Sequence, residues 1–97
     1  MISRQWRGPA KPSAADRYVE HLRVETFPLL SRIEGFMGAS ILRRTLAEAV
    51  EFLIVTRWDS LEAIRRFAGA NAAQAVVPDT VRAMMVSYDE QLLTMKK

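Results

Sequence analysis

Residues 48–62 read Glu-Ala-Val-Glu-Phe-Leu-Ile-Val-Thr-Arg-Trp-Asp-Ser-Leu-Glu, and this stretch decides the fold. β-Branched and aromatic residues dominate its first part, Glu48–Trp58, as is typical of a β-strand. Successive side chains of a strand project to opposite faces of a sheet, and the central residues Phe52–Val55 are all apolar. Both faces of the predicted strand are therefore apolar at its centre, which indicates a sheet that is covered on both sides.

A helix is predicted directly after this strand. Asp59 and Glu62 stand three residues apart, which is the spacing of a capping box, in which side chains satisfy free N–H groups of the first helical turn. An apolar stripe then continues over Leu61–Ala68, the predicted helix. A longer helix is predicted over Ser13–Ser31, with a kink at Pro28 because proline has no N–H to donate.

The remaining elements complete a regular order. This order is strand, helix, strand, strand, helix, strand, over residues 2–7, 13–31, 37–45, 48–58, 61–68 and 84–95. It is typical of an α+β fold with a ferredoxin-like βαββαβ arrangement, in which a four-stranded antiparallel sheet carries both helices on one face. Two helices leave the other face of the sheet uncovered, and we expect a second copy of the chain to cover it in a homodimer.

Length and composition are those of a small globular protein. The 97 residues suffice for one domain, residues 1–97, and 49% of them are hydrophobic and 26% charged. Cysteine is absent, and no apolar run approaches the roughly 18 residues of a membrane span, so we expect neither disulfides nor a membrane. The first residues have no apolar core like that of a signal peptide, and the expected location is the cytoplasm.

The net charge of +3 comes from basic residues that are scattered along the chain and interleaved with acidic ones. Nucleic-acid binders usually gather basic side chains in one stripe, so no nucleic-acid partner is expected. A metal site is equally unexpected, because the chain has a single histidine and no tight cluster of carboxylates.

Several short motifs together resemble the antibiotic biosynthesis monooxygenase family. They are spread over nearly the whole chain, at Trp6–Gly8, Tyr18, Glu34–Ala39, Arg57–Ile64 and Ala75–Pro78. The resemblance implies a dimeric α/β barrel, in which the sheets of two copies pack face to face. It also implies a cofactor-independent monooxygenase that oxidises a small aromatic or quinol-type substrate in a cleft between helices and sheet. The alternative is a non-catalytic dimeric module that binds a small molecule or supports a partner.

Haem-degrading proteins that the chain also resembles use an asparagine in the first strand, a tryptophan at the end of the third strand and a histidine in the second helical region. Trp58 matches the tryptophan. The first strand of this chain has no asparagine, and no histidine stands near residues 75–76. We therefore expect no cofactor, and haem in particular is not expected.

His21 and Trp58 are the predicted catalytic residues. His21 shares a side of the predicted helix with Tyr18 and Glu25, so it is either a general base oriented by Glu25 or a half-exposed surface histidine. Trp58 either stacks on a planar substrate or anchors the core at the end of its strand. We expect Trp58 and His21 to border the same cleft, with Tyr18 nearby.

The residues predicted to bind the substrate are Arg4, Trp6, Tyr18 and Arg57. A guanidinium pairs well with planar anions, so Arg4 and Arg57 either hold a carboxylate or phenolate of the substrate or form surface salt bridges. Trp6 either contacts the substrate or packs in the core. Phe67 is interpreted as a core residue, together with the other phenylalanines.

Overall fold

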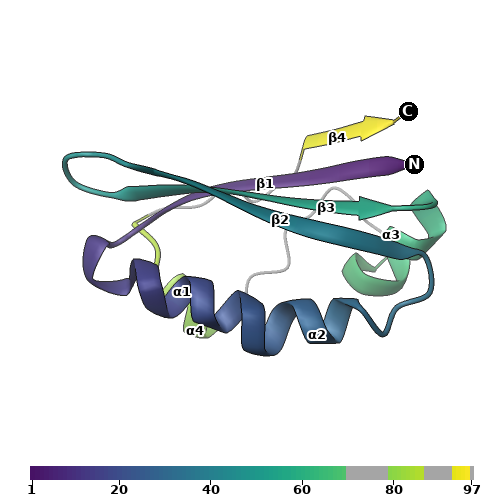
Figure 1. Ribbon diagram of the computed structural model, residues 1–97, viewed down its shortest axis with the longest axis horizontal. Helices are drawn as coiled ribbons and strands as arrows, with labels where there is room; N and C mark the ends of the chain where they lie inside the picture. The colour runs from purple at the N-terminus through teal and green to yellow at the C-terminus, as the bar shows by residue number, and fades with distance from the viewer. Residues whose placement is uncertain (70–78, 87–92, 97) are drawn as a thin grey trace.

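An antiparallel sheet with the strand order β2-β3-β1-β4 forms one layer of the molecule (Figure 1). The computed structural model describes residues 1–69, 79–86 and 93–96. The strands are β1 (Ile2–Ala10), β2 (Phe36–Thr45), β3 (Val50–Trp58) and β4 (Leu93–Lys96). The α+β class and the antiparallel sheet predicted from the sequence are confirmed.

The segment between β1 and β2 is a continuous helical run with three kinds of turn. Its parts are the 3₁₀-helix η1 (Pro12–Ala14), α1 (Ala15–His21), the π-helix η2 (Leu22–Thr26) and α2 (Phe27–Leu30). The run matches the helix predicted over Ser13–Ser31 to within one residue at each end. No helix in the described part of the chain is long and apolar enough to cross a membrane.

The π-helix η2 lies directly before Pro28, and the chemistry of proline accounts for it. Proline has no N–H, and in a regular α-helix its ring would clash with the carbonyl four residues earlier, here that of Val24. The chain widens instead, and the N–H of Phe27 donates to the carbonyl of Leu22, five residues back. The predicted kink at Pro28 therefore takes the form of a widened turn just before the proline.

After β3 the chain forms α3 (Leu61–Ala68), with the bounds predicted from its apolar stripe. Ser60 caps this helix, because its Oγ accepts a hydrogen bond of 3.2 Å from the N–H of Ala63. The prediction had given this role to Asp59. A short helix, α4 (Asp79–Arg82), follows later in the chain.

Strands β1 and β3 direct their even-numbered side chains toward the helices. The register pairs Trp6 with Ile54 and Arg7 with Leu53. Every even-numbered residue of β3 is buried, whereas the odd-numbered ones are only partly buried. The helical run packs on the buried face in one apolar cluster, and α3 packs on it in another. Both predicted helices therefore lie on one face of the sheet (Figure 1), and Leu53 lies on the other.

The last strand differs most from the prediction, which placed it over residues 84–95. Among the described residues β4 has four, so the three long strands make up most of the described sheet. The chain after α4 forms a turn instead, and an isolated bridge joins Ala10 to Met85. The sequence also predicts a helical turn over residues 72–76, capped by Asn71, and a bulge of the last strand near residues 89–90, and both lie outside the described residues.

Strand β1 is longer than predicted, because it continues through Gly8 to Ala10. A side chain at position 8 would collide with the Trp6 indole, since a Cβ there would lie 2.6 Å from its Cη2 atom. Glycine at this position therefore lets the indole of Trp6 lie across its own strand.

Gly35, between α2 and β2, generates a first prediction. Its φ is +96°, and a Cβ there would lie 2.5 Å from Oδ1 of Asp59 and 2.6 Å from Cβ of Ala63. Gly35→Ala is expected to lower the free energy of unfolding by about 2–4 kcal/mol, because the collision adds to the cost of a left-handed backbone. Urea unfolding measures this loss.

Gly69 provides the matched control for that substitution. Its φ is +83° and its ψ −165°, but a Cβ there would meet no atom of the described residues within 4 Å. Gly69→Ala should therefore cost less than Gly35→Ala, about 1–3 kcal/mol from the backbone alone. Equal losses for the two variants would contradict the packing described around Gly35.

Candidate functional site

Two adjoining cavities lie between the sheet and the helices. The sheet-side cavity, of about 80 Å³, reaches Arg4 and Thr56 on the strands, and the helix-side cavity, of about 400 Å³, reaches His21 and Glu25 on the helical run. Five residues line both cavities: Trp6, Tyr18, Leu22, Thr26 and Phe67. The two cavities are therefore parts of one space, which we call the helix–sheet cleft.

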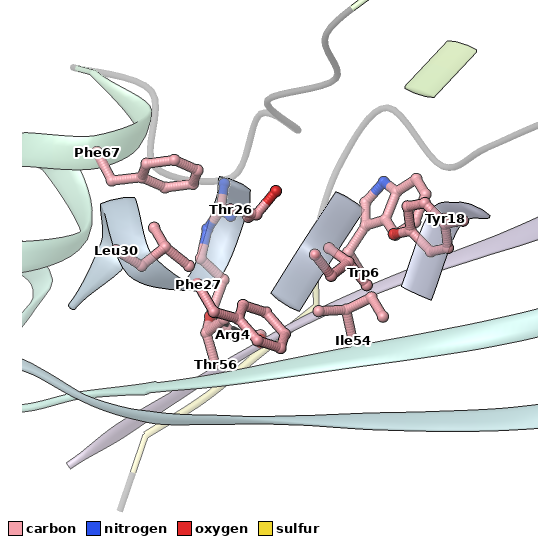
Figure 2. Close-up of a pocket in the computed structure, with 10 residues that line it drawn as sticks. Arg4, Trp6, Tyr18, Thr26, Phe27, Leu30, Ile54, Thr56 and Phe67 are labelled. Atoms are coloured by element: carbon pink, nitrogen blue, oxygen red, sulfur yellow. Dashed lines mark hydrogen bonds between the residues drawn. The ribbon is translucent and has the colours of Figure 1, made fainter. Parts of the chain in front are cut away.

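Arg4 supplies a buried positive charge in this cleft. It lies on the helix-facing side of β1 and is only 5% exposed. Its guanidinium carbon lies 5.6 Å from the centre of the Phe67 ring, a cation–π geometry. Figure 2 shows the side chain rising from the sheet toward Phe67 and Thr26. Burial lowers the pKa of the Arg4 guanidinium to about 10, so the group remains charged at neutral pH.

Aromatic side chains form much of the cleft wall. The rings of Trp6 and Tyr18 lie 6.2 Å apart, and Tyr18 in turn meets Phe52 edge-on at 4.9 Å. Burial raises the pKa of the Tyr18 phenol well above its usual value. Tyr18 is therefore neutral at physiological pH and acts as a hydrogen-bonding group, not as a base.

His21 and Glu25 form a close pair on the helix-side cavity. The Nδ1 atom of His21 lies 2.6 Å from Oε2 of Glu25, and the two side chains are 13% and 69% exposed. In a neutral imidazole, the nitrogen that faces a carboxylate carries the proton, which leaves Nε2 as the acceptor. The structure thus brings Tyr18, His21 and Glu25 to one cleft, as their helical spacing predicted.

Trp58 does not line this cleft, contrary to our prediction. The side chain is 0% exposed, and its indole N–H donates a hydrogen bond of 2.8 Å to Oγ1 of Thr56. Its ring is stacked with that of Phe67, with 6.2 Å between the centroids. Neither cavity counts Trp58 among its described lining residues. Of the two interpretations offered for Trp58, this geometry favours the core anchor.

Arg57 lies on the opposite face of the sheet from Arg4. It occupies an odd-numbered position of β3, and its Nη1 donates a hydrogen bond of 3.1 Å to Oγ of Ser40. The sheet therefore separates Arg57 from Arg4, although each of them was predicted to bind the substrate. Of the four predicted binding residues, Arg4, Trp6 and Tyr18 line the cleft.

Phe67 and Thr26 line both cavities, although the sequence predicted neither of them there. Phe67 was assigned to the core because it belongs to the apolar stripe of α3. Thr26 belongs to no motif in the sequence that would have marked it as a cleft residue. Pro28, two residues later, could have indicated an irregular helical turn at this point. A proline inside a helical pattern implies an irregular turn, and π-helical turns are frequent at functional sites. Among the described residues, no group of three or more acidic or histidine side chains is placed to hold a metal ion.

The fold is shared by solved structures of other proteins. The chain resembles a putative antibiotic biosynthesis monooxygenase from Bacillus cereus, with a TM-score of 0.65 and 21% identity over 99% of this chain and 93% of that one. It resembles SnoaB, a cofactor-independent oxygenase from Streptomyces nogalater, with a TM-score of 0.61 and 19% identity over 99% and 93% of the two chains. MhuD, a haem degrader from Mycobacterium tuberculosis, gives a TM-score of 0.59 and 22% identity over 100% and 95%. Among curated proteins, none matches the sequence significantly.

The structure of MhuD overturns one expectation. The sequence predicted no cofactor, on the grounds that the first strand lacks asparagine and residues 75–76 lack histidine. MhuD has two haems bound in its active site. A protein of this fold therefore accommodates haem, and the prediction that excluded a cofactor was wrong.

The sequence itself decides the family. A profile of antibiotic biosynthesis monooxygenases matches residues 1–79. This match spans β1, the helical run, β2, β3 and α3, and thus most of the described residues that line the helix–sheet cleft. The chain belongs to the antibiotic biosynthesis monooxygenase family.

Proposed function

We propose that the chain is an oxygenase that binds a planar aromatic anion in the helix–sheet cleft, with Arg4 as the partner of the anion. The observation that carries this proposal is a buried guanidinium in a cavity with aromatic walls. Planar carboxylates and phenolates are the anions whose geometry a guanidinium matches best.

The walls and the charge recognise different parts of such a ligand. Trp6, Tyr18 and Phe67 offer apolar ring surfaces to an aromatic system, and Arg4 offers a charge to its acidic group. The phenol of Tyr18, kept neutral by burial, is available to hydrogen-bond the same ligand. An electron-rich anion held away from water and stabilised by fixed protein charge is a suitable reactant for molecular oxygen.

Haem is itself a planar aromatic anion, and the donor set of the cleft suits it. Arg4 would pair with a carboxylate of the porphyrin, and the rings of Trp6, Tyr18 and Phe67 would contact its faces. Haem, when bound, supplies oxygen activation at its iron. Haem therefore belongs to the proposed class of ligands.

We also propose a homodimer formed through the face of the sheet opposite the helices. Leu53 and Val55 lie on this face and are only partly buried within one chain, and Leu42 beside them on β2 is 50% exposed. A second copy is a suitable occupant, because a two-fold interface is self-complementary and a domain of 97 residues gains stability from added burial. The cytoplasmic location stays a prediction.

Removal of the Arg4 charge tests the ligand class. Arg4→Met is expected to weaken binding of 6-hydroxy-2-naphthoate and of haemin by about 10–100-fold, because a charged hydrogen bond to the ligand is lost. Arg57→Met, on the opposite face, is the matched control and should leave both affinities unchanged. Isothermal titration calorimetry measures the binding, and equal effects of the two variants would refute the proposed site.

Oxygen uptake distinguishes an enzyme from a binding module. A planar quinol acid, 1,4-dihydroxy-2-naphthoate, is expected to be oxidised faster with the wild-type protein than without it, and Arg4→Met should lose most of that acceleration. An oxygen electrode follows the reaction, with and without haemin. Binding of the quinol without any acceleration in either condition would favour the non-catalytic module.

A charge on the outer face of the sheet tests the dimer. The wild-type protein should scatter light as a particle of twice the 11.0 kDa mass of one chain. Leu53→Asp should give monomers, because a buried unpaired carboxylate costs several kcal/mol per copy. Leu61→Asp, at a 40% exposed leucine on α3, is the control and should remain dimeric. A wild-type monomer at micromolar concentration would contradict the proposal.

A further inference from the structure

The helix–sheet cleft carries a different polar group at each of its two ends. Of the two cavities of the cleft, Arg4 lines the sheet-side one alone, whereas His21 and Glu25 line the helix-side one alone. The five residues shared by both cavities lie between these ends, and four of them are apolar or aromatic. A ligand that fills the cleft would therefore meet the guanidinium and the imidazole at separate points.

We infer that the ligand carries an acidic group at one end and an ionisable hydroxyl at the other, and that His21 removes the hydroxyl proton with Glu25 as its positioning residue. This inference rests on the proposed function, because it places the same aromatic anion in the same cleft. It adds the second functional group of the ligand and the group on the protein that acts on it.

Glu25 prepares His21 for this role. The Oε2 atom of Glu25 lies 2.6 Å from Nδ1 of His21, and a carboxylate this close favours the tautomer with the proton on Nδ1, which makes Nε2 the basic nitrogen. After Nε2 takes up a proton, the same carboxylate stabilises the imidazolium. Glu25 belongs to the π-helix η2, so the turn that accommodates Pro28 also carries the partner of the base.

The proton transfer is complete without a further reactant. The O–H bond of the ligand breaks, its electron pair stays on the oxygen, and the proton forms a new N–H bond at Nε2 of His21. The product is a phenolate, which is the electron-rich species that the proposed oxidation requires. Arg4 binds a group that is already ionised, so it governs affinity, whereas His21 governs the ionisation of the second group.

Charged side chains of the helical run lie near His21. His21 also lines a separate hollow of about 310 Å³, and the charged side chains that line this hollow with it, among the described residues, are those of Arg17, Glu20 and Glu25. Two uncharged residues from outside the helical run also line this hollow, Thr80 of α4 and Met84, which follows that helix. The charged residues of α4, Asp79 and Arg82, approach each other to 4.0 Å. Among these charged side chains, that of Glu25 is the one that the structure places directly against the imidazole.

A probe with two ends tests the inference. In 6-hydroxy-2-naphthoate the carboxylate and the hydroxyl stand at opposite ends of a naphthalene, and ionisation of the hydroxyl shifts its absorption to longer wavelength. With the wild-type protein at neutral pH, the ionised fraction of bound probe should exceed that of free probe by about tenfold, a change of one pKa unit for the ligand. His21→Gln should remove this increase and change the Kd by less than about threefold.

Substitution of Glu25 tests the positioning residue, and the same substitution at Glu20 is its control. Glu25→Gln keeps an acceptor for Nδ1 but loses the charge, so the ionised fraction should fall several-fold at a similar Kd. Glu20→Gln removes a neighbouring carboxylate of the same hollow and should have a much smaller effect. Far-UV circular dichroism checks the fold, and if His21→Gln fails to fold, Glu25→Gln carries the test alone.

The outcomes separate this inference from the proposed function. A wild-type protein that binds the probe without raising its ionised fraction, or a His21→Gln variant with an unchanged spectrum, overturns the inference and leaves the proposed function standing. Failure of the wild-type protein to bind, or binding that Arg4→Met does not weaken, overturns both. The compound without the hydroxyl, 2-naphthoate, should bind within about threefold of the probe, because the contact with Arg4 is unchanged.

Discussion

The pairing of β1 with β3 is the constraint on which the rest of the structure depends. This register sets Arg4 opposite Thr56 and Trp6 opposite Ile54, and it directs all four side chains toward the helices. A slip of one residue would exchange the two faces of the strand and move Arg4 to the outer side. The side chains available in the cleft therefore depend on this register, because it directs the even-numbered residues of β1 and β3 toward the helices.

A chain of ring contacts connects the apolar core to the charge in the cleft. Trp58 stacks on Phe67, and Phe67 lies over the guanidinium of Arg4. The indole N–H of Trp58 also donates to Thr56, another residue of the sheet-side cavity. Trp58 thus contacts two residues of the cleft wall, Phe67 and Thr56, on their core side. A fully buried side chain at the end of a strand can in this way stabilise a site that it does not line.

Local patterns predicted the elements well, because they depend on residues near one another in the chain. The alternation in β3 and the apolar stripe of α3 are such patterns, and both elements lie where they were expected. Prediction of the residues that line the cleft required knowledge of contacts between residues far apart in the chain. Arg4 and Arg57 look alike in the sequence, and only the position of each relative to the helices separates them. The end of a strand equally suits a core residue and a cleft residue, so Trp58 was misplaced while His21 and Tyr18, spaced on one helix, were not.

The first strand of the chain occupies an inner place in the sheet, between β3 and β4. During synthesis, β1 leaves the ribosome before either of its partners, and it remains unpaired until residues 50–58 follow. The helical run, whose hydrogen bonds are local, can form long before that moment. Closing the loop between β1 and β3 is consequently the slow step expected for this topology. The guanidinium of Arg4 leaves water only when that loop closes, so the most costly desolvation of the cleft falls late in folding.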